Sequence, residues 1–262
     1  MSSQEGRWPE HAPPWWRTLP RRALMRSSVG RRVWWYGRGR GSELAFWSAW
    51  LTGAPGAEEW AGDRALRLDP ETPIRDPVVR DEIERLDRDT ISILDVGAGP
   101  LTRLGYRYPG KALTIVPVDP LADSYNRLVR RAGLEPPVPT RRVAGEALLE
   151  HFAPASFDIA YAANSLDHSA NPVPIVESML ELVRSDGVVL LRHRRNEGER
   201  ERYEGFHQWN FDLVDASFVC WNGAARVDLT ALLAGRGTTE AWIVDDEVVA
   251  RITPSAVVAA AS

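Results

Sequence analysis

The segment SILDVGAGPLTRLG (Ser92–Gly105) places an acid and two glycines directly after a run of apolar residues. Asp95 precedes Gly97 by two positions, and Gly99 follows after one further residue. A glycine loop between a strand and a helix lets the backbone approach a ligand closely and points its N–H groups at that ligand. The dinucleotide fingerprint requires a third glycine three residues after the second, but Thr102 stands there. The two glycines by themselves therefore identify no particular ligand.

Polar residues also follow three other apolar or strand-like runs. Asp119 ends the run Ala112–Asp119, and an α/β fold that binds a nucleoside places a carboxylate there for the ribose hydroxyls. Glu146 follows a short basic stretch at 140–143, and the run Phe157–Ala163 leads into the polar residues NSLDH. Open parallel sheets bind ligands outside the carboxyl ends of their strands. We therefore expect these groups to line one nucleoside site.

Two histidines are candidates for proton transfer, because an imidazole titrates near neutral pH. His168 follows the run Phe157–Ala163 and stands next to Asp167, while His207 lies in YEGFHQWNFD, beyond the run 186–193. Asp167 and His168 could also supply metal ligands, but no further ligand cluster is evident in the sequence, so we expect no metal. The alternative is structural: a hydrogen-bonded loop residue for His168, and a corner that closes the site for His207.

The residues after His207 suggest a class of substrate. Trp209 and Asn210 offer an aromatic face and an amide, which suit a sugar-like or polyol molecule. Arg194, within the arginine-rich stretch 191–205, could bind an anionic group. We favour the alternative for that stretch, a solvated loop in which nearby glutamates balance the arginines.

The order of the apolar runs predicts the scaffold that positions these residues. Near-continuous apolar strands that alternate with helices indicate a parallel sheet covered on both faces. Strands are expected at 91–96, 112–119, 140–143, 157–163 and 186–193, with helices at about 121–132 and at 171–184, the latter stopped by Gly187. After residue 217 the β-like runs SFVCW and AWIVDDEVVARI flank a short helix near 228–234. The sheet is therefore expected to end with antiparallel strands.

The N-terminal region has a different composition. Residues 11–42 contain eight arginines and no acid, so the other residues carry the compensating excess of acids that makes the whole chain −4. Such an arm can contact nucleic acid, a membrane, its own acidic domain or a partner subunit. We expect an extension over 1–75 with short helices and a disordered first dozen residues, one helix being Ser42–Leu51 with Ser42 as its N-cap. The main domain is expected at 76–255, opening with a helix at Asp76–Leu86, and a flexible tail at 256–262.

The composition excludes several classes of protein. Apolar residues make up 44% of the 262 residues and charged ones 26%, as in a soluble globular protein. No apolar run approaches the roughly 18–20 residues of a membrane-spanning helix, and the N-terminus has no signal pattern, so a cytoplasmic protein is expected. The single cysteine, Cys220, excludes an internal disulfide and a zinc site built from cysteines.

Taken together, the strand-end motifs resemble those of the class I S-adenosylmethionine-dependent methyltransferases. The resemblance covers about Ile91–His193 and is carried by ILDVGAGP, Asp119, GEA at 145–147, FDIAYAANSLDH and LVRSDGVVLLRH. It implies that S-adenosylmethionine is the cofactor, with its methionine part on the glycine loop, its ribose on Asp119 and its adenine beside Glu146 and Ala147. The cofactor-binding residues it implies are Asp95, Gly97, Ala98, Gly99, Asp119, Pro120, Gly145, Glu146, Ala147 and Asn164.

Two further features bear on this resemblance. Pro100-Leu101-Thr102 replaces the commoner extra glycine of the family's loop, which puts a cofactor contact by Thr102 in doubt. The phrase GFHQWNF is similar to one seen in methyltransferases encoded among bacterial glycan and natural-product pathways. The implied fold is a Rossmann-like, mostly parallel seven-stranded sheet with helices on both faces, an antiparallel C-terminal strand pair and a helical N-terminal extension.

The leading hypothesis is a methyltransferase that acts on a hydroxyl of a small molecule or sugar. His168, His207 and Asp167 are its expected catalytic residues, and Trp209, Asn210 and Arg194 are expected to contact the acceptor. The alternatives are a non-catalytic scaffold, an NAD-dependent oxidoreductase and a nucleic-acid methyltransferase. The position of Asp95 argues against the oxidoreductase. No nucleic-acid partner is expected, because NSLD stands where an N-methylating tetrapeptide would follow the strand, and the arm offers a possible contact between copies of the chain.

Overall fold

The computed structural model describes residues 39–255. The expectations for the rest of the arginine- and tryptophan-rich arm, including its disordered first dozen residues and its contact with another copy, lie outside the described residues. The flexible tail expected at 256–262 lies outside them as well. Within residues 39–255, no helix has both the length and the apolar character needed to span a membrane.

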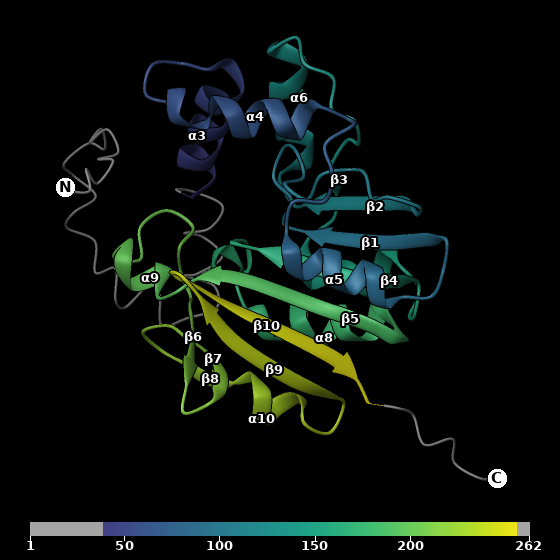
Figure 1. Ribbon diagram of the computed structural model, residues 1–262. Helices are drawn as coiled ribbons and strands as arrows, with labels where there is room; N and C mark the ends of the chain where they lie inside the picture. Colours follow the sequence, from purple (N-terminus) through teal and green to yellow (C-terminus); the bar gives the residue numbers. More distant parts are fainter. Residues whose placement is uncertain (1–38, 256–262) are drawn as a thin grey trace.

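A seven-stranded sheet forms the centre of the protein (Figure 1), in the order β3-β2-β1-β4-β5-β10-β9. Its strands are β1 (Thr90–Val96), β2 (Ala112–Asp119), β3 (Arg141–Arg142), β4 (Phe157–Ala163), β5 (Val183–Arg194), β9 (Gly237–Val244) and β10 (Glu247–Pro254). The first five strands in this order are parallel, whereas β10 runs antiparallel to both β5 and β9. The predicted fold class, a mostly parallel sheet with an antiparallel C-terminal pair, is confirmed.

Helices cover both faces of this sheet, as the apolar strands require. The α-helices are α3 (Arg40–Thr52), α4 (Ala61–Leu68), α5 (Pro77–Arg85), α6 (Ala122–Arg131), α7 (Leu148–His151), α8 (Pro172–Leu182), α9 (Glu197–Arg200) and α10 (Leu229–Leu233). Three short 3₁₀ turns join them: η3 (Glu58–Trp60), η4 (Gly145–Ala147) and η5 (Leu166–His168). Because side chains alternate along a strand, Ile93 packs in the core with α5, whereas its neighbour Leu94 packs with α8 on the other face.

Four local predictions need correction. Helix α3 begins at Arg40 with Gly39 as its N-cap, and Ser42 lies inside it with its Oγ bonded to the Gly39 carbonyl. Helix α8 ends at Leu182, where β5 already begins, so Gly187 does not stop it. The basic strand expected at 140–143 is reduced to the two residues of β3. SFVCW is β7 (Ser217–Trp221) of a separate three-stranded sheet, with β6 (Asn210–Val214) and β8 (Arg226–Asp228) beside it.

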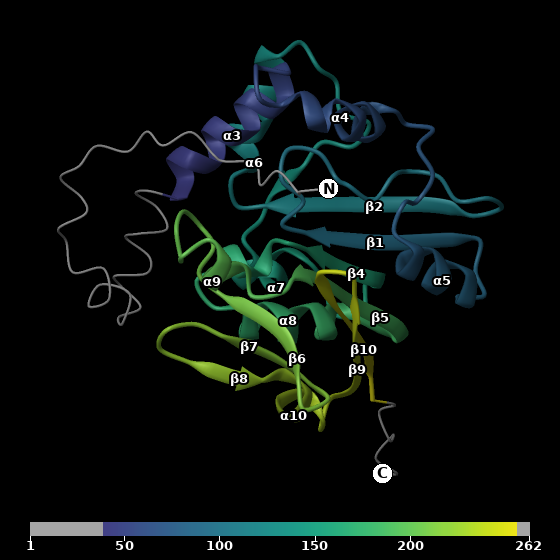
Figure 2. The same cartoon turned by 60° about the vertical axis from the view of Figure 1, so that its left-hand side comes forward.

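The described part of the N-terminal extension packs on the main sheet domain. Trp50 and Leu51 of α3 share an apolar core with Leu101, which follows the glycine loop, and with Val129 of α6. Figure 2 shows α3 beside α6, near the edge of the sheet formed by β2 and β3. Helix α3, in the described part of the extension, therefore lies over the loop that opens the predicted site.

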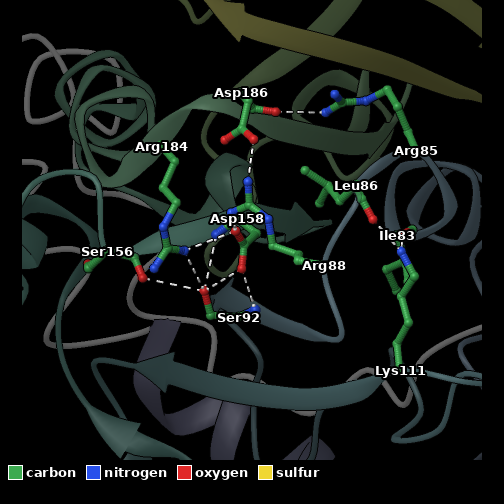
Figure 3. Close-up of polar contacts among 10 residues, drawn as sticks. All are labelled: Ile83, Arg85, Leu86, Arg88, Ser92, Lys111, Ser156, Asp158, Arg184 and Asp186. Atoms are coloured by element: carbon green, nitrogen blue, oxygen red, sulfur yellow. Dashed lines mark hydrogen bonds and ion pairs between the residues drawn. The ribbon is translucent and has the colours of Figure 1, made fainter.

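The amino ends of the strands are held by an ion network (Figure 3). The carboxylate of Asp158, at the start of β4, pairs with Arg88 and, at 2.9 Å, with Arg184 of β5. Its Oδ2 accepts from the backbone N–H of Ser92 at 2.7 Å and lies 2.8 Å from the Ser92 hydroxyl. Arg88 also pairs with Asp186. This network joins β1, β4 and β5 at the edge opposite to the glycine loop.

Candidate functional site

The glycine loop fits tightly against the segment after β4. Gly97 and Gly99 have φ angles of 74° and 65°, in the left-handed region that glycine adopts at no steric cost. A Cβ on Gly97 would lie 2.3 Å from the Cβ of Ser165, and the Ser165 hydroxyl donates to the carbonyl of Val96 at 2.9 Å. Ala98 is held by a bond from its N–H to the Val118 carbonyl of β2. The sequence did not single out Ser165, which joins the ends of β1 and β4.

Asp119 lies at the end of β2 and faces the loop. It is only 8% exposed, and its carboxylate accepts from the backbone N–H of Gly99 at 3.2 Å and of Leu121 at 2.7 Å. Burial raises the pKa of Asp119 to about 7, and the nearby Glu43 contributes to the rise. A carboxylate has about four acceptor positions, so Asp119 retains capacity for the two hydroxyls of a ribose.

Asp95 is buried at the end of β1 and supports the second half of the loop. Its Oδ2 accepts a bond from the Thr102 hydroxyl at 2.6 Å, and burial raises its pKa to about 6. Thr102 therefore holds the loop to its strand. A cofactor contact by Thr102 stays untested.

Helix α3 covers the glycine loop. The sequence predicted the helix and the loop but not this contact between them. A Cβ on Gly99 would lie 3.1 Å from the indole ring of Trp47. The Trp47 Nε1–H donates to Glu43 at 2.7 Å, and the hydroxyl of Tyr125 on α6 donates to the same oxygen at 3.3 Å. Trp47, Glu43 and Tyr125 are thus candidate site residues that sequence reasoning missed. The only signal was the apolar face of the helix, which says nothing about what that face covers.

The other expected cofactor residues lie at the same edge in different environments. Gly145 in η4 packs on Ile175, where a Cβ would come within 2.8 Å of the side chain, while Glu146 is exposed and Ala147 and Pro120 are half-buried. The amide oxygen of Asn164 accepts the backbone N–H of Arg194 at 2.7 Å, so this side chain holds the end of β5. Contacts of these residues with a cofactor remain predictions.

Next to the glycine loop, three polar side chains from two segments that are distant in the sequence lie close together. Asp167 and His168 belong to η5, and His207 comes from the loop before β6. His207 Nδ1 lies 2.8 Å from Asp167 Oδ2 and 3.2 Å from His168 Nε2, and that Nε2 lies 3.5 Å from Asp167 Oδ2. Asp167 is 2% exposed, whereas the side chains of His168 and His207 are 24% and 30% exposed. The Asp167–His168–His207 cluster is therefore buried at the carboxylate and accessible at the imidazoles.

The charges of this cluster act on one another. Burial opposes ionisation of Asp167, but His168 and the hydrogen-bonded His207 outweigh it and hold the pKa of Asp167 far below its ordinary value. Burial also opposes the charged form of His207, yet its bond to Asp167 raises the pKa of His207 to about 9. The cluster thus keeps a carboxylate and a positive charge side by side.

A third histidine, His193 near the end of β5, lies close to this cluster. It is fully buried, stacks on Phe211 with 4.3 Å between the ring centroids, and burial lowers its pKa to about 4. The two ring nitrogens of His193 have no hydrogen-bond partner, and Oδ1 of Asp167 has none either. Three of the chain's five histidines therefore gather around Asp167. From the sequence, His193 was assigned only to a basic stretch. Its position at the end of an apolar strand was a signal that could have identified it as a site residue.

The three residues expected to contact an acceptor lie in different settings. Asn210 is fully buried: its amide donates to the Tyr203 hydroxyl at 3.0 Å and its oxygen accepts the Glu199 N–H at 2.8 Å, which makes it part of the fold. Trp209 is buried, with no partner for its indole N–H. Arg194 is exposed and pairs with Glu197 at 3.4 Å, as the solvated-loop alternative predicts. Contact of any of the three with an acceptor stays a prediction.

Comparisons with known proteins give similarities at low identity. No protein-family model matches the chain, and no curated protein matches it. A Thermotoga maritima structure described as an S-adenosylmethionine-dependent methyltransferase, possibly a histamine N-methyltransferase, is 13% identical over 80% of this chain and 99% of its own, with a TM-score of 0.44. DhpI in complex with SAH is 16% identical over 82% and 96%, with a TM-score of 0.43. A putative methyltransferase of the same kind from Listeria monocytogenes is 13% identical over 67% and 97%, at 0.42. The activity has therefore to be inferred from the site itself.

Proposed function

We propose that this protein is an S-adenosylmethionine-dependent methyltransferase that transfers a methyl group to a hydroxyl of a small molecule or sugar. The observation that carries the proposal is the contact between Gly97 and Ser165. It joins the loop that faces Asp119 to the segment that begins the Asp167–His168–His207 cluster two residues later. A nucleoside-type edge and an acid–imidazole cluster thus adjoin at the carboxyl ends of parallel strands, where such sheets bind ligands.

On the cofactor side, the residues present fit a nucleoside. Asp119 has free acceptor capacity for ribose hydroxyls, and the contact of Gly97 with Ser165 positions the glycine loop beside it. Asp95 and Thr102 hold the loop, and Trp47 of α3 closes over it. We propose that Glu146 and Ala147, in the turn after β3, lie beside the adenine.

On the acceptor side, the cluster supports loss of a proton from a hydroxyl. S-Adenosylmethionine supplies a methyl group on a positively charged sulfur, so that a C–O bond forms as the C–S bond breaks. Alignment of the oxygen with that methyl group provides much of the rate. The imidazole of His168 is partly exposed and lies 3.5 Å from Asp167, which suits it to accept the proton of the hydroxyl. His207, which Asp167 holds in its charged form, can donate a hydrogen bond to the acceptor oxygen.

Calorimetry with S-adenosylhomocysteine tests the cofactor half of the proposal. We expect micromolar binding by the full chain, no binding of NAD, and a loss of affinity of about 100-fold, or roughly 2.7 kcal/mol, in Asp119→Ala. Asp123→Ala is the matched control, because Asp123 lies on the adjoining helix α6, is 57% exposed in its side chain and pairs only weakly with Arg142 at 3.3 Å. It is expected to bind as the wild type does.

The alternatives give different results in the same experiment. Preference for NAD would overturn the methyltransferase in favour of an oxidoreductase, and no binding of either ligand would favour the non-catalytic scaffold. If S-adenosylhomocysteine binds, incubation with labelled methyl donor and a panel of sugars and small alcohols tests the acceptor. Labelling of RNA or DNA instead, with salt-dependent affinity, would assign a nucleic-acid substrate.

A further inference from the structure

We propose that Asp167, His168 and His207 bind one divalent transition-metal ion of the zinc class at the acceptor side of the site. The inference deepens the proposed function and rests on it for the role of the ion, but the site itself is defined by these three side chains. Within residues 39–255, they form a group of three such side chains whose possible ligand atoms all lie within 4.8 Å of one another.

The spacing of the three atoms fits a shared cation. Asp167 Oδ2, His168 Nε2 and His207 Nδ1 form a triangle with sides of 2.8, 3.2 and 3.5 Å. A triangle with these sides has a circumradius of about 1.9 Å, slightly shorter than the roughly 2.0–2.1 Å of zinc–nitrogen and zinc–oxygen bonds. A point just outside the plane of the three atoms therefore lies at bonding distance from all of them, without movement of the backbone.

The ligand types and their exposure point to the same class of ion. Two imidazoles and one carboxylate suit zinc and its neighbours in the first transition row, whereas magnesium prefers oxygen ligands. Zinc sites that take part in catalysis have three protein ligands and an open fourth position. Here the two imidazoles are about a quarter to a third exposed, so an ion can enter and its remaining position can face an acceptor.

A second observation is the unmet bonding capacity of the buried carboxylate. Oδ1 of Asp167 is buried and has no hydrogen-bond partner, although a buried carboxylate oxygen left without one costs free energy. A cation on Asp167 offsets this cost, because it neutralises the carboxylate and can take its second oxygen. His193, with both ring nitrogens also unpartnered, is close enough to Asp167 for their charges to interact.

A bound cation gives the cluster a defined part in the reaction. Coordination of the acceptor's hydroxyl oxygen lowers the pKa of that hydroxyl, so its proton passes to water before the oxygen attacks the methyl group. Asp167, His168 and His207 then act by holding the ion beside the glycine loop, and no imidazole has to accept the proton.

Metal binding is tested on the full chain, with any affinity tag removed and bound metal stripped by a chelator. Zinc and, separately, magnesium are titrated by calorimetry, and retained metal is counted after dialysis. We expect one zinc ion per chain and much weaker binding of magnesium. His168→Gln and His207→Gln should each weaken zinc binding by at least about tenfold, since even partners of a ligand are worth 10–100-fold in metal affinity. His151→Gln, at an exposed histidine of α7, is the matched control and should bind as the wild type does.

The outcomes separate this inference from the proposed function. No stoichiometric zinc binding, or equal binding in His168→Gln, His207→Gln and the wild type, overturns the metal site. S-adenosylhomocysteine affinity is measured on the same preparations: if it is present without zinc binding, the methyltransferase stands and the metal site falls. If zinc binds and S-adenosylhomocysteine does not, the reverse holds. Melting temperatures of the two variants show whether they fold, and a cobalt-substituted wild type, whose visible spectrum reports nitrogen ligands, provides a test that needs no variant.

Discussion

Two buried aspartates lie at opposite ends of the sheet's strands and differ in the number of partners that their carboxylates have. Asp158, at the amino ends of the strands, receives two arginines on one oxygen and the N–H and hydroxyl of Ser92 on the other (Figure 3). Asp167, beyond the carboxyl ends, contacts two imidazoles through Oδ2 while Oδ1 has no partner. Both residues are 2% exposed, so burial does not distinguish them.

The difference is in how completely the two carboxylates are satisfied. Buried polar groups that serve only the fold are almost always fully bonded, since an unmade bond costs about 1–3 kcal/mol. Asp158 follows this rule, and its partners join three strands. Asp167 departs from it beside the glycine loop, which is where departures for function are expected. We infer that the first edge stabilises the sheet and the second binds ligands.

The largest expected effect is at the stabilising edge. Asp158→Asn should lower the free energy of unfolding by roughly 3 kcal/mol, at the low end for a broken buried ion pair because Arg88 and Arg184 are partly exposed to water. Urea unfolding measures the change. The affinity of the folded variant for S-adenosylhomocysteine should stay within about twofold of wild type, and a large loss of affinity would contradict the division between the two edges.

The next comparison is between two glycines with the same backbone conformation, one at each end of the strands. Gly97 and Gly110 have φ angles of 74° and 75°, but only Gly97 has a neighbour, Ser165, where a Cβ would lie. Gly110→Ala should cost about 1 kcal/mol for the left-handed conformation alone. Gly97→Ala should cost about 2 kcal/mol more and weaken S-adenosylhomocysteine binding, since loop and Ser165 must separate. Equal melting temperatures for the two variants would mean that the contact is not tight.

The pH dependence of stability offers a smaller effect at the ligand edge. Burial raises the pKa of Asp119 to about 7 in the folded protein, from an ordinary value of 3.8. The group therefore favours the folded state at low pH, and this contribution is lost as pH rises from about 4 through 7. The ligand-free protein should lose on the order of 1 kcal/mol between pH 6 and 8 from this group. Asp119→Asn should lack that loss. If the melting temperatures of the wild type and the variant change with pH in the same way, the prediction is contradicted.

The same ionisation should affect ligand binding in the opposite direction. Ribose hydroxyls donate to an ionised carboxylate, so the affinity for S-adenosylhomocysteine should rise by up to about tenfold between pH 6 and 8. Calorimetry at several pH values measures this rise. The Asp123→Ala control should show the same profile, and a flat wild-type profile would argue against a ribose contact by Asp119.

A smaller loss of stability than at Asp158 is expected at Asp167. Asp167→Asn should lower the free energy of unfolding, because the lowered pKa of Asp167 and the raised pKa of His207 show that their bond favours the folded state. The loss should stay below that of Asp158→Asn, because His168 and His207 are partly exposed and water can replace part of the bond. Methyl transfer and zinc binding should nevertheless be lost. A destabilisation as large as that of Asp158→Asn would show that the cluster serves the fold.

Much of the scaffold could be predicted because its signals are local. The apolar runs predicted β1, β2 and β4 to within one residue, whereas β5 begins three residues earlier than predicted. The helix expected to open at Asp76 is α5, where the Asp76 carboxylate accepts the Val78 N–H. The errors were also local in origin. Ser42 has the residue type of an N-cap but lies inside α3, and SFVCW has a strand pattern that does not say which sheet it joins.

The sequence by itself determined which residues end or closely follow each strand, and therefore made Asp95, Asp119 and Asp167 candidates, because strand periodicity and chain direction are properties of short segments. Only the tertiary structure decided which of them meet. His207 is 40 residues from Asp167 in the chain, yet the order β4-β5-β10 and the separate sheet that starts at β6 bring their side chains within 2.8 Å. The same is true of Trp47 over Gly99 and of Asn210, whose amide is bonded inside the protein. Long-range packing sets these contacts, and it depends on the shape of the whole core, which no short segment contains.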